Sequence, residues 1–571
     1  MPSKPSQKQN FLQGALILSL GTVLVKIIGA LFKIPLSNLI GTRGMGLFTA
    51  AYNIYTTLFI ISTAGLPVAV SKMVSEASAH RRLDETRAIF RVALSCFVVI
   101  GAAGSCFLFF GARMVSGWLN NQDAYQSVLA IAPAVLFVAV MSAFRGFYQG
   151  QGNMIPTAVS QVIEALCKLF IGYVLASWMF NSFLKAPLSA ENALRIDQLI
   201  RDALDKGEPL TQLKATNILA GMIAAPGAIA GISIGAVAGS VYLILRYRRQ
   251  NKKKTLSSHA SPLVRPQREL MRELMRLAIP VTISASVLNL TNLIDTGLVM
   301  GRLQSAAGFT YDNALNLYGS YTFAQTLFNL PSAFILTLSV SIIPALSAAL
   351  TKKDYAGANQ TIRSSLRITS LLAMPAAAGL SALSFPILNL LYGSKQPEAV
   401  ALAAPLLTTL GFAVPFVCLV SLTNAILQSM GLVNLPILSM LIGGACKIGV
   451  NYILVGNPEI NIHGAPVGTI VCYAVIASLN LFFIIRQTRS IQLLGVFVKP
   501  LIASVAMGFI AYISNSFLTK TLHWGSHMSA ILTIGASVVF YLIVVVLIRA
   551  LPKEDMLLIP GGNKLAKWIR L

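Results

Sequence analysis

Charged side chains are scarce in this sequence, and acidic ones are the scarcest. Asp, Glu, Lys and Arg together make up 11% of the chain, and only 19 of its 571 residues are acidic, whereas 55% are hydrophobic. A soluble domain needs much more polar surface to face water. The composition therefore excludes an ordinary soluble fold and predicts a protein that crosses a membrane many times.

Motifs for catalysis, nucleotide binding and metal binding are also missing. The sequence contains no HExxH, no GxSxG and no P-loop. Six cysteines lie in apolar stretches without any CxxC pair, and we interpret them as small core residues: Cys96, Cys106, Cys167, Cys418, Cys446 and Cys472. We expect no enzymatic activity, no metal site and no cofactor, and any transport would draw on the membrane potential, H⁺ or Na⁺.

Fourteen apolar segments are long enough to cross a bilayer, for which a helix needs about 20 residues. The segments do not alternate with period two as barrel strands would, so each is expected to be a helix. The predicted fold is an all-α polytopic membrane protein with transmembrane helices at 11–40, 50–72, 88–112, 125–148, 154–180, 218–246, 274–301, 315–345, 364–391, 399–427, 432–456, 462–486, 495–518 and 527–550.

The net charge of +25 comes mainly from Lys and Arg in the short connections between these segments. This is the topology signal of a membrane protein, and without a soluble basic domain it does not indicate nucleic-acid binding. Alternate connections, counted from the N-terminus, hold about three times as many Lys and Arg as the others, which predicts that both termini are cytoplasmic. The basic connection 251–271 then joins two halves on the cytoplasmic side and can touch anionic lipid.

An internal repeat predicts the arrangement of the helices. QGQGNMIPTAVSQVIEALCK (149–168) returns as QSMGLVNLPILSMLIGGACK (428–447), with identities that include the terminal Cys and Lys. Each copy contains six spans and so enters and leaves on the same side, which predicts two pseudo-symmetric lobes with a pathway between them. We assign 1–250 to the N-lobe, 272–490 to the C-lobe and 491–571 to two further helices and a cytoplasmic tail. The N-lobe carries an outer insert at 181–217, in which 193–204 has the spacing of a short amphipathic helix.

Six ionisable residues fall deep within predicted spans, where each costs about 2.5–3.5 kcal/mol at a helix centre. This cost indicates that most of them face protein or water: Lys26, Lys33, Glu164, Lys168, Asp295 and Lys447. Four cations against two anions predict a net positive pathway.

The repeat and the helical spacing suggest how these charges are arranged. Lys26 corresponds to Asp295 in the second copy, and the two can pair in one conformation; Lys33 corresponds to Arg302. Glu164 precedes Lys168 by four residues, the favourable direction for an intrahelical ion pair. Lys447 has glycine at the position of Glu164, so we expect it to be the more exposed cation. Structural pairs and snorkelling to the interface are the alternatives to a functional role.

Two motifs carry a resemblance to a known family: VKIIGALFKIPLSNLIG (25–41) and GLFTAAYNIYTTLFIISTAGLPVAVSKMVSE (46–76). With the six-plus-six-plus-two spans, the chain resembles the multidrug/oligosaccharidyl-lipid/polysaccharide exporter superfamily, in the Gram-positive branch of stage V sporulation protein B and MurJ-type lipid II flippases. The resemblance implies outward flipping of undecaprenyl-pyrophosphate-linked sugars, with first-span cations binding pyrophosphate. Lys26 takes the place of the first such cation, whereas Phe32-Lys33 departs from the Gram-negative pattern. The last two spans would offer a groove for the lipid tail.

We therefore expect a flippase that exports a lipid-linked oligosaccharide across the cytoplasmic membrane of a Gram-positive-type bacterium by alternating access. Membrane lipids and cell-wall synthesis enzymes are the further partners expected. The pyrophosphate would meet Lys26, Lys33, Lys168, Lys447 and Arg302, while Asp295 and Glu164 would serve ion coupling or gating. Two alternatives stay open: a cation-coupled multidrug exporter, which favours an acidic cavity, and a non-transporting scaffold for envelope synthesis.

Overall fold

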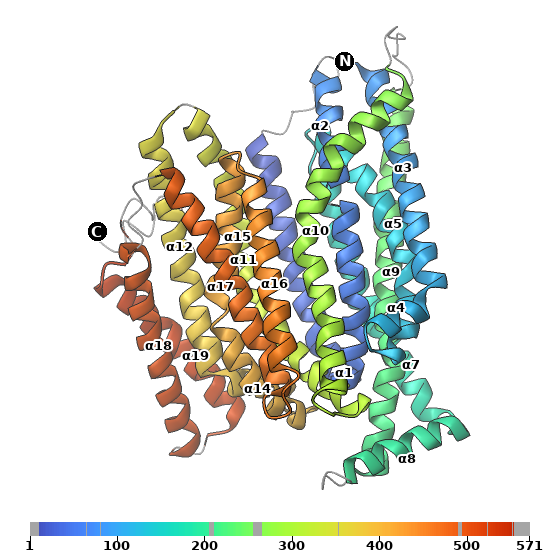
Figure 1. Ribbon diagram of the computed structural model, residues 1–571, viewed down its shortest axis with the longest axis vertical. Helices are drawn as coiled ribbons and strands as arrows, with labels where there is room; N and C mark the ends of the chain where they lie inside the picture. Colours follow the sequence, from blue (N-terminus) through green and yellow to red (C-terminus); the bar gives the residue numbers. More distant parts are fainter. Residues whose placement is uncertain are drawn as a thin grey trace. The chain divides into compact units, whose positions relative to one another are not determined.

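The computed structural model describes residues 11–63, 65–79, 82–204, 210–254, 265–351, 353–488, 494–521, 524–550 and 552. Over these ranges the chain is almost entirely helical and forms no strand (Figure 1). This confirms the all-α fold expected from the long apolar segments. The middle of the basic linker (255–264) and the C-terminal tail (553–571) lie outside the described residues.

Within the described residues, nine helices are long and apolar enough to cross a membrane, or up to eleven if each of two bent pairs is one span. The first two predicted spans run together in the stretch Leu24–Ser78. The spans at 274–301 and 315–345 fall within α10 (Gln267–Ser305) and α11 (Tyr311–Thr351), which are not among the nine. The chain is a multi-pass membrane protein, and the count of fourteen stays a prediction.

The chain divides into two compact units, Met1–Gly319 and Ser320–Leu571. In the first unit, α5 packs between α3 and α9, and α9 also contacts α1, α6 and α7. This unit extends beyond the N-lobe boundary proposed at 250, because α10 packs along α1 and α2. Its elements before α10 are α1 (Phe11–Thr63), α2 (Gly65–Ala79), α3 (Leu83–Phe110), α4 (Ala112–Trp118), η1 (Gln122–Ala124), α5 (Tyr125–Gly150), α6 (Ile155–Cys167), the π-helical turn η2 (Lys168–Gly172), α7 (Tyr173–Lys185), α8 (Ala190–Leu204) and α9 (Gln212–Lys254).

Helix α1 folds back on itself at Gly41. A continuous helix would separate Lys33 from Tyr52 by about 28 Å, yet the Lys33 ammonium lies 5.3 Å from the centre of the Tyr52 ring. Gly41 has φ 68° and ψ −173°, a backbone conformation that side chains with a Cβ rarely adopt. The glycine thus ends the first predicted span and returns the chain as the second.

The second unit contains α11 from Ser320 onward and eight further α-helices. The last two predicted spans appear as α18 and α19, and α18 packs against both α12 and α19. Leu371, Met507 and Tyr541 belong to the apolar cluster that joins these three helices, where the Tyr541 hydroxyl donates to the Leu371 carbonyl oxygen at 2.7 Å. The helices are α12 (Tyr355–Ala382), α13 (Ser384–Tyr392), α14 (Pro397–Gly411), α15 (Val414–Ser429), α16 (Asn434–Leu454), α17 (Gly464–Thr488), α18 (Leu494–Lys520) and α19 (Ser526–Leu547), with a 3₁₀ turn η4 (Asn461–His463).

The repeated sequence forms the same turn in each unit. Gly152 and Gly431 adopt φ angles of 74° and 79°. Their amides donate to the carbonyl oxygens of Gln149 (2.9 Å) and Gln428 (3.0 Å). A residue with positive φ that closes the end of a helix is most often glycine. The matched turns lie just before α6 and α16. The same number of residues therefore separates each glycine from the lysine that follows it, Lys168 or Lys447.

The outer insert contains the helix expected there. Helix α8 runs crosswise near one end of α7 and α9 (Figure 1). Ile196 and Leu199 are buried against Leu219 of α9, with Phe183 of α7 beside them. The periodicity therefore predicted the helix, and its apolar face is covered by these neighbours. Leu204, which the spacing placed on the same face, is exposed; residues 205–209 lie outside the described part.

Candidate functional site

Two of the predicted cations meet at one tyrosine ring in the first unit. The Lys168 ammonium lies 4.4 Å from the centre of the Tyr52 ring, and the Lys33 ammonium lies 5.3 Å from it. Lys168 also donates to the Tyr52 hydroxyl at 3.4 Å and lies 5.3 Å from the Phe32 ring. These distances are within the range of cation–π attraction. We call Phe32, Lys33, Tyr52 and Lys168 the lysine cluster.

Two local features place these lysines together. The return of α1 at Gly41 brings Lys33 beside Tyr52, and a row of aromatic rings (Phe32, Phe48, Tyr52, Tyr55, Phe59), with neighbouring centres 5.6–6.1 Å apart, runs across the two arms. Lys168 begins the π-helical turn η2, in which backbone hydrogen bonds join residues five apart instead of four. Such turns often mark functional sites. The second copy has no such break, since α16 runs through Lys447 as a regular helix.

Lys26 belongs to the same electrostatic environment. Its side chain is exposed, and both Lys26 and Lys168 act on Lys33 by charge repulsion. Lys33 and Lys168 are each partly buried. Gathering like charges in this way is unfavourable unless an anion or water compensates them. The three ammonium groups thus form a place where an anion would be stabilised.

Glu164 is paired differently from the sequence prediction. Its carboxylate accepts a hydrogen bond from Arg145 at 3.1 Å and another from the Tyr55 hydroxyl at 2.7 Å. No ion pair within 4.0 Å joins it to Lys168 among the contacts of the described residues, so the expected direct pair does not form in this conformation, although the charge of Glu164 still acts on Lys168. A guanidinium on α5 competes successfully because it approaches the carboxylate from a neighbouring helix.

Arg145 is the charged residue that the sequence reasoning missed. It is 5% exposed, and its Nε donates to Ser160 Oγ at 3.0 Å. Arg145 lies three residues before the end of the apolar segment 125–148, where a basic residue is typical of the short connection that follows a span. The sequence signal that could have pointed to it is Ser160, its hydrogen-bond partner, which is identical in both copies of the repeat. In the structure Ser160 and its counterpart Ser439 are both fully buried.

Asp295 and Arg302 lie on α10 and are not members of the lysine cluster. Asp295 is 5% exposed, whereas Lys26 is exposed, and both Asp295 and Arg302 have other interactions. Next to Asp295, Thr296 accepts hydrogen bonds from Asn53 at 2.9 Å and Tyr318 at 3.2 Å. The ion pair of Lys26 with Asp295 therefore remains a prediction for another conformation.

Lys447 lies in the second unit and is only 5% exposed. The expectation that it is the more exposed of the two repeated lysines is wrong, since Lys168 is partly exposed. Gly443, which replaces the glutamate of the first copy, allows α17 to approach closely: a Cβ there would lie 2.8 Å from the Cys472 carbonyl oxygen. The absence of a side chain at Gly443 thus permits close packing beside Lys447, which has interactions of its own.

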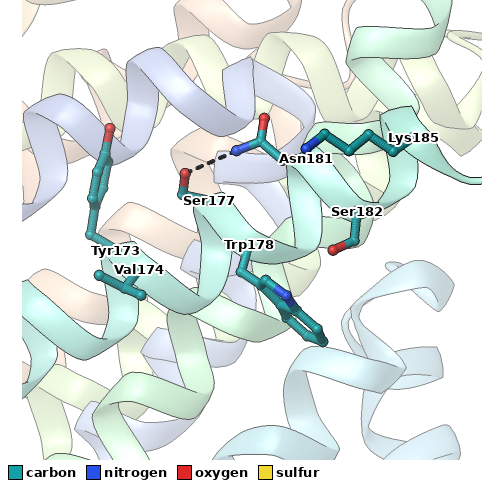
Figure 2. Close-up of a pocket in the computed structure, with 7 residues that line it drawn as sticks. All are labelled: Tyr173, Val174, Ser177, Trp178, Asn181, Ser182 and Lys185. Carbon is teal, nitrogen blue, oxygen red and sulfur yellow. Dashed lines mark hydrogen bonds between the residues drawn. The ribbon is translucent and has the colours of Figure 1, made fainter.

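A separate open cavity of about 440 Å³ lies along one face of α7. Figure 2 shows its lining, with Tyr173 and Lys185 at opposite ends and a hydrogen bond between Asn181 and Ser177. All seven lining residues come from this one helix, and none is a predicted site residue. The lysine cluster lies where helices pack against one another, whereas this cavity lies on the surface of a single helix.

Comparison with protein families gives two matches. A model described as "Lipid II flippase MurJ" matches residues 120–534, and one described as "Polysaccharide biosynthesis protein" matches residues 11–201. Two similar relatives come from Bacillus subtilis (strain 168). "Stage V sporulation protein B" is 25% identical, with 97% of this chain and 98% of that protein covered. "Lipid II flippase MurJ" is 28% identical, with 90% of this chain and 88% of that protein covered.

Solved structures show the same fold. A structure of "Lipid II flippase MurJ, inward closed conformation" matches with a TM-score of 0.67 at 14% identity, covering 93% of this chain and 98% of that one. A multidrug resistance MATE family transporter in an inward-facing conformation matches with a TM-score of 0.61 at 12% identity, covering 84% and 98%. At these identities the likeness concerns the fold alone.

Proposed function

Because the chain belongs to the family of MurJ lipid II flippases, whose members are transporters and not enzymes, we propose that it flips an undecaprenyl-pyrophosphate-linked oligosaccharide outward across the cytoplasmic membrane. Lipid II or a related peptidoglycan or polysaccharide precursor is the substrate class, and a Gram-positive-type envelope with cytoplasmic termini is the setting. The observation that carries the proposal is the meeting of Lys33 and Lys168 at Tyr52, with Lys26 nearby.

The lysine cluster suits a pyrophosphate that must bind and then leave. Lysine is a compact point charge on a flexible stem, so it can follow a moving headgroup without holding it in the fixed bidentate geometry of arginine. The partly buried setting strengthens attraction to an anion relative to water. An interior-negative membrane potential also favours export of negative charge, by about 2.3 kcal/mol per charge per 100 mV.

The remaining predicted residues take supporting roles in this proposal. Lys447 and Arg302 supply positive charge from the second copy, and Asp295 serves gating or ion coupling. The prenyl chain stays in lipid, beside α18 and α19, which carry exposed apolar side chains such as Phe509 and Leu542. Alternating access of two lobes would move the headgroup while the tail follows in the bilayer.

Reconstituted vesicles test the proposal against the multidrug alternative. Purified protein should move a fluorescent undecaprenyl-pyrophosphate disaccharide between leaflets, and K33A/K168A should abolish this movement while the fold is retained. Export of a cationic dye with no movement of the lipid would instead support a multidrug exporter. Normal complementation of flippase-depleted cells by K33A/K168A would support a scaffold without a charged transport site.

A further inference from the structure

Arg145 keeps a nearby carboxylate, Glu164, out of direct contact with the lysine cluster. Glu164 and Lys168 are four residues apart, a spacing at which their side chains can meet on one helix face. Instead, the carboxylate is held by Arg145 at 3.1 Å and by Tyr55 at 2.7 Å. Lys168 turns to the Tyr52 ring and hydroxyl. Glu164 still attracts Lys168 through its charge, but its direct contacts are with Arg145 and Tyr55, so the Lys168 ammonium is not held by the carboxylate.

The surroundings of Arg145 fix this arrangement. Its Nε donates to Ser160, whose hydroxyl in turn donates to the Thr157 carbonyl oxygen at 2.8 Å. Met141, one turn earlier on α5, contacts the guanidinium through its sulfur at 3.5 Å. The side chain is 5% exposed. A buried guanidinium held at several points is a fixed counter-charge, whereas a solvated one would exchange partners.

We infer that Arg145 is a positioning residue for anion binding: by neutralising Glu164, it keeps Lys168 free to bind the pyrophosphate of the substrate. This inference rests on the proposed function and adds a residue that touches no substrate. It also assigns Glu164 a structural role, in place of the ion coupling suggested by its position within the membrane. The guanidinium and the Tyr55 hydroxyl each occupy one oxygen of this carboxylate, whose side chain is only 16% exposed.

Four proteins test the inference: wild type, R145Q, E164Q and R145Q/E164Q. Binding of undecaprenyl pyrophosphate to purified protein in nanodiscs is measured for each. In R145Q the freed carboxylate should pair with Lys168 and weaken binding by tenfold or more. E164Q, which has no carboxylate to neutralise, should bind within about threefold of wild type. The double variant should recover to the level of E164Q. A purely structural pair would instead weaken binding in E164Q as well, because that variant leaves a buried guanidinium without its counter-charge.

The results that overturn the inference are distinct. Unchanged binding by R145Q, or equal loss in R145Q and the double variant, would remove Arg145 from this role. Labelling of Lys168 by an amine-reactive reagent, followed by mass spectrometry, provides a readout without substrate: labelling should slow in R145Q and return in the double variant, with Lys185 as the reference site. If wild type binds no pyrophosphate lipid while the labelling pattern holds, the proposed function fails and the charge arrangement stands.

Discussion

Replacement of Lys168 by methionine separates binding from stability. Methionine keeps an unbranched apolar chain in the same space and removes only the ammonium, which lies 4.4 Å from the Tyr52 ring and 3.4 Å from its hydroxyl. A hydrogen bond to a charged group contributes about 1.5–3 kcal/mol. Loss of one such contact to pyrophosphate should weaken binding by about 10- to 150-fold.

The stability of the protein should not fall with this change. The ammonium is partly buried beside Lys33, so removing it relieves repulsion and desolvation that offset its attraction to the Tyr52 ring. We expect the midpoint of thermal unfolding in detergent to stay the same or rise. Titration with undecaprenyl pyrophosphate and with undecaprenyl monophosphate measures the binding change, and K185M, at the exposed end of α7, is the matched control.

A loss of less than threefold in K168M would refute the assignment of Lys168 to the headgroup. Equal losses in K168M and K185M would show that only the overall charge matters. A fall in the unfolding midpoint that parallels the loss of binding would instead mean that the lysine holds the helices together, and the cluster would then be structural.

Three further predictions concern packing and surface contacts. G231A should lower the midpoint of thermal unfolding, because a Cβ at Gly231 would lie 2.2 Å from the Gly172 Cα and overpacking costs about 1–3 kcal/mol. An unchanged midpoint would contradict the close approach of α9 to η2. Y541F should destabilise the protein by about 1 kcal/mol in chemical unfolding, because the hydroxyl of Tyr541 donates to the buried Leu371 carbonyl at 2.7 Å; a neutral result would argue against that bond. R195A removes the ion pair with Asp123 at 2.6 Å. Burial lowers the pKa of Arg195, but the Asp123 carboxylate outweighs it and raises that pKa overall. Because the pair is partly exposed, the free energy of unfolding should fall by less than about 1 kcal/mol in chemical unfolding, and a larger loss would contradict this.

The sequence alone determined the properties that depend on local composition. Long apolar segments must be helical in a bilayer because every backbone polar group needs a partner there, and the all-helical structure follows. The repeated turn is also a local property, because a positive φ angle restricts the residue type at Gly152 and Gly431. The helix of the insert followed from its periodicity.

Tertiary structure decided which charges meet. The intrahelical pair of Glu164 with Lys168 was predicted from spacing, but Arg145 approaches Glu164 from α5, and no pattern within one helix reveals a competitor on another. The burial of Lys447 likewise depends on the close approach of α17 at Gly443. Hydropathy and helical spacing are local and periodic, so the chain specifies them directly. Electrostatic partners are chosen by distance in space, which only the packed helices define.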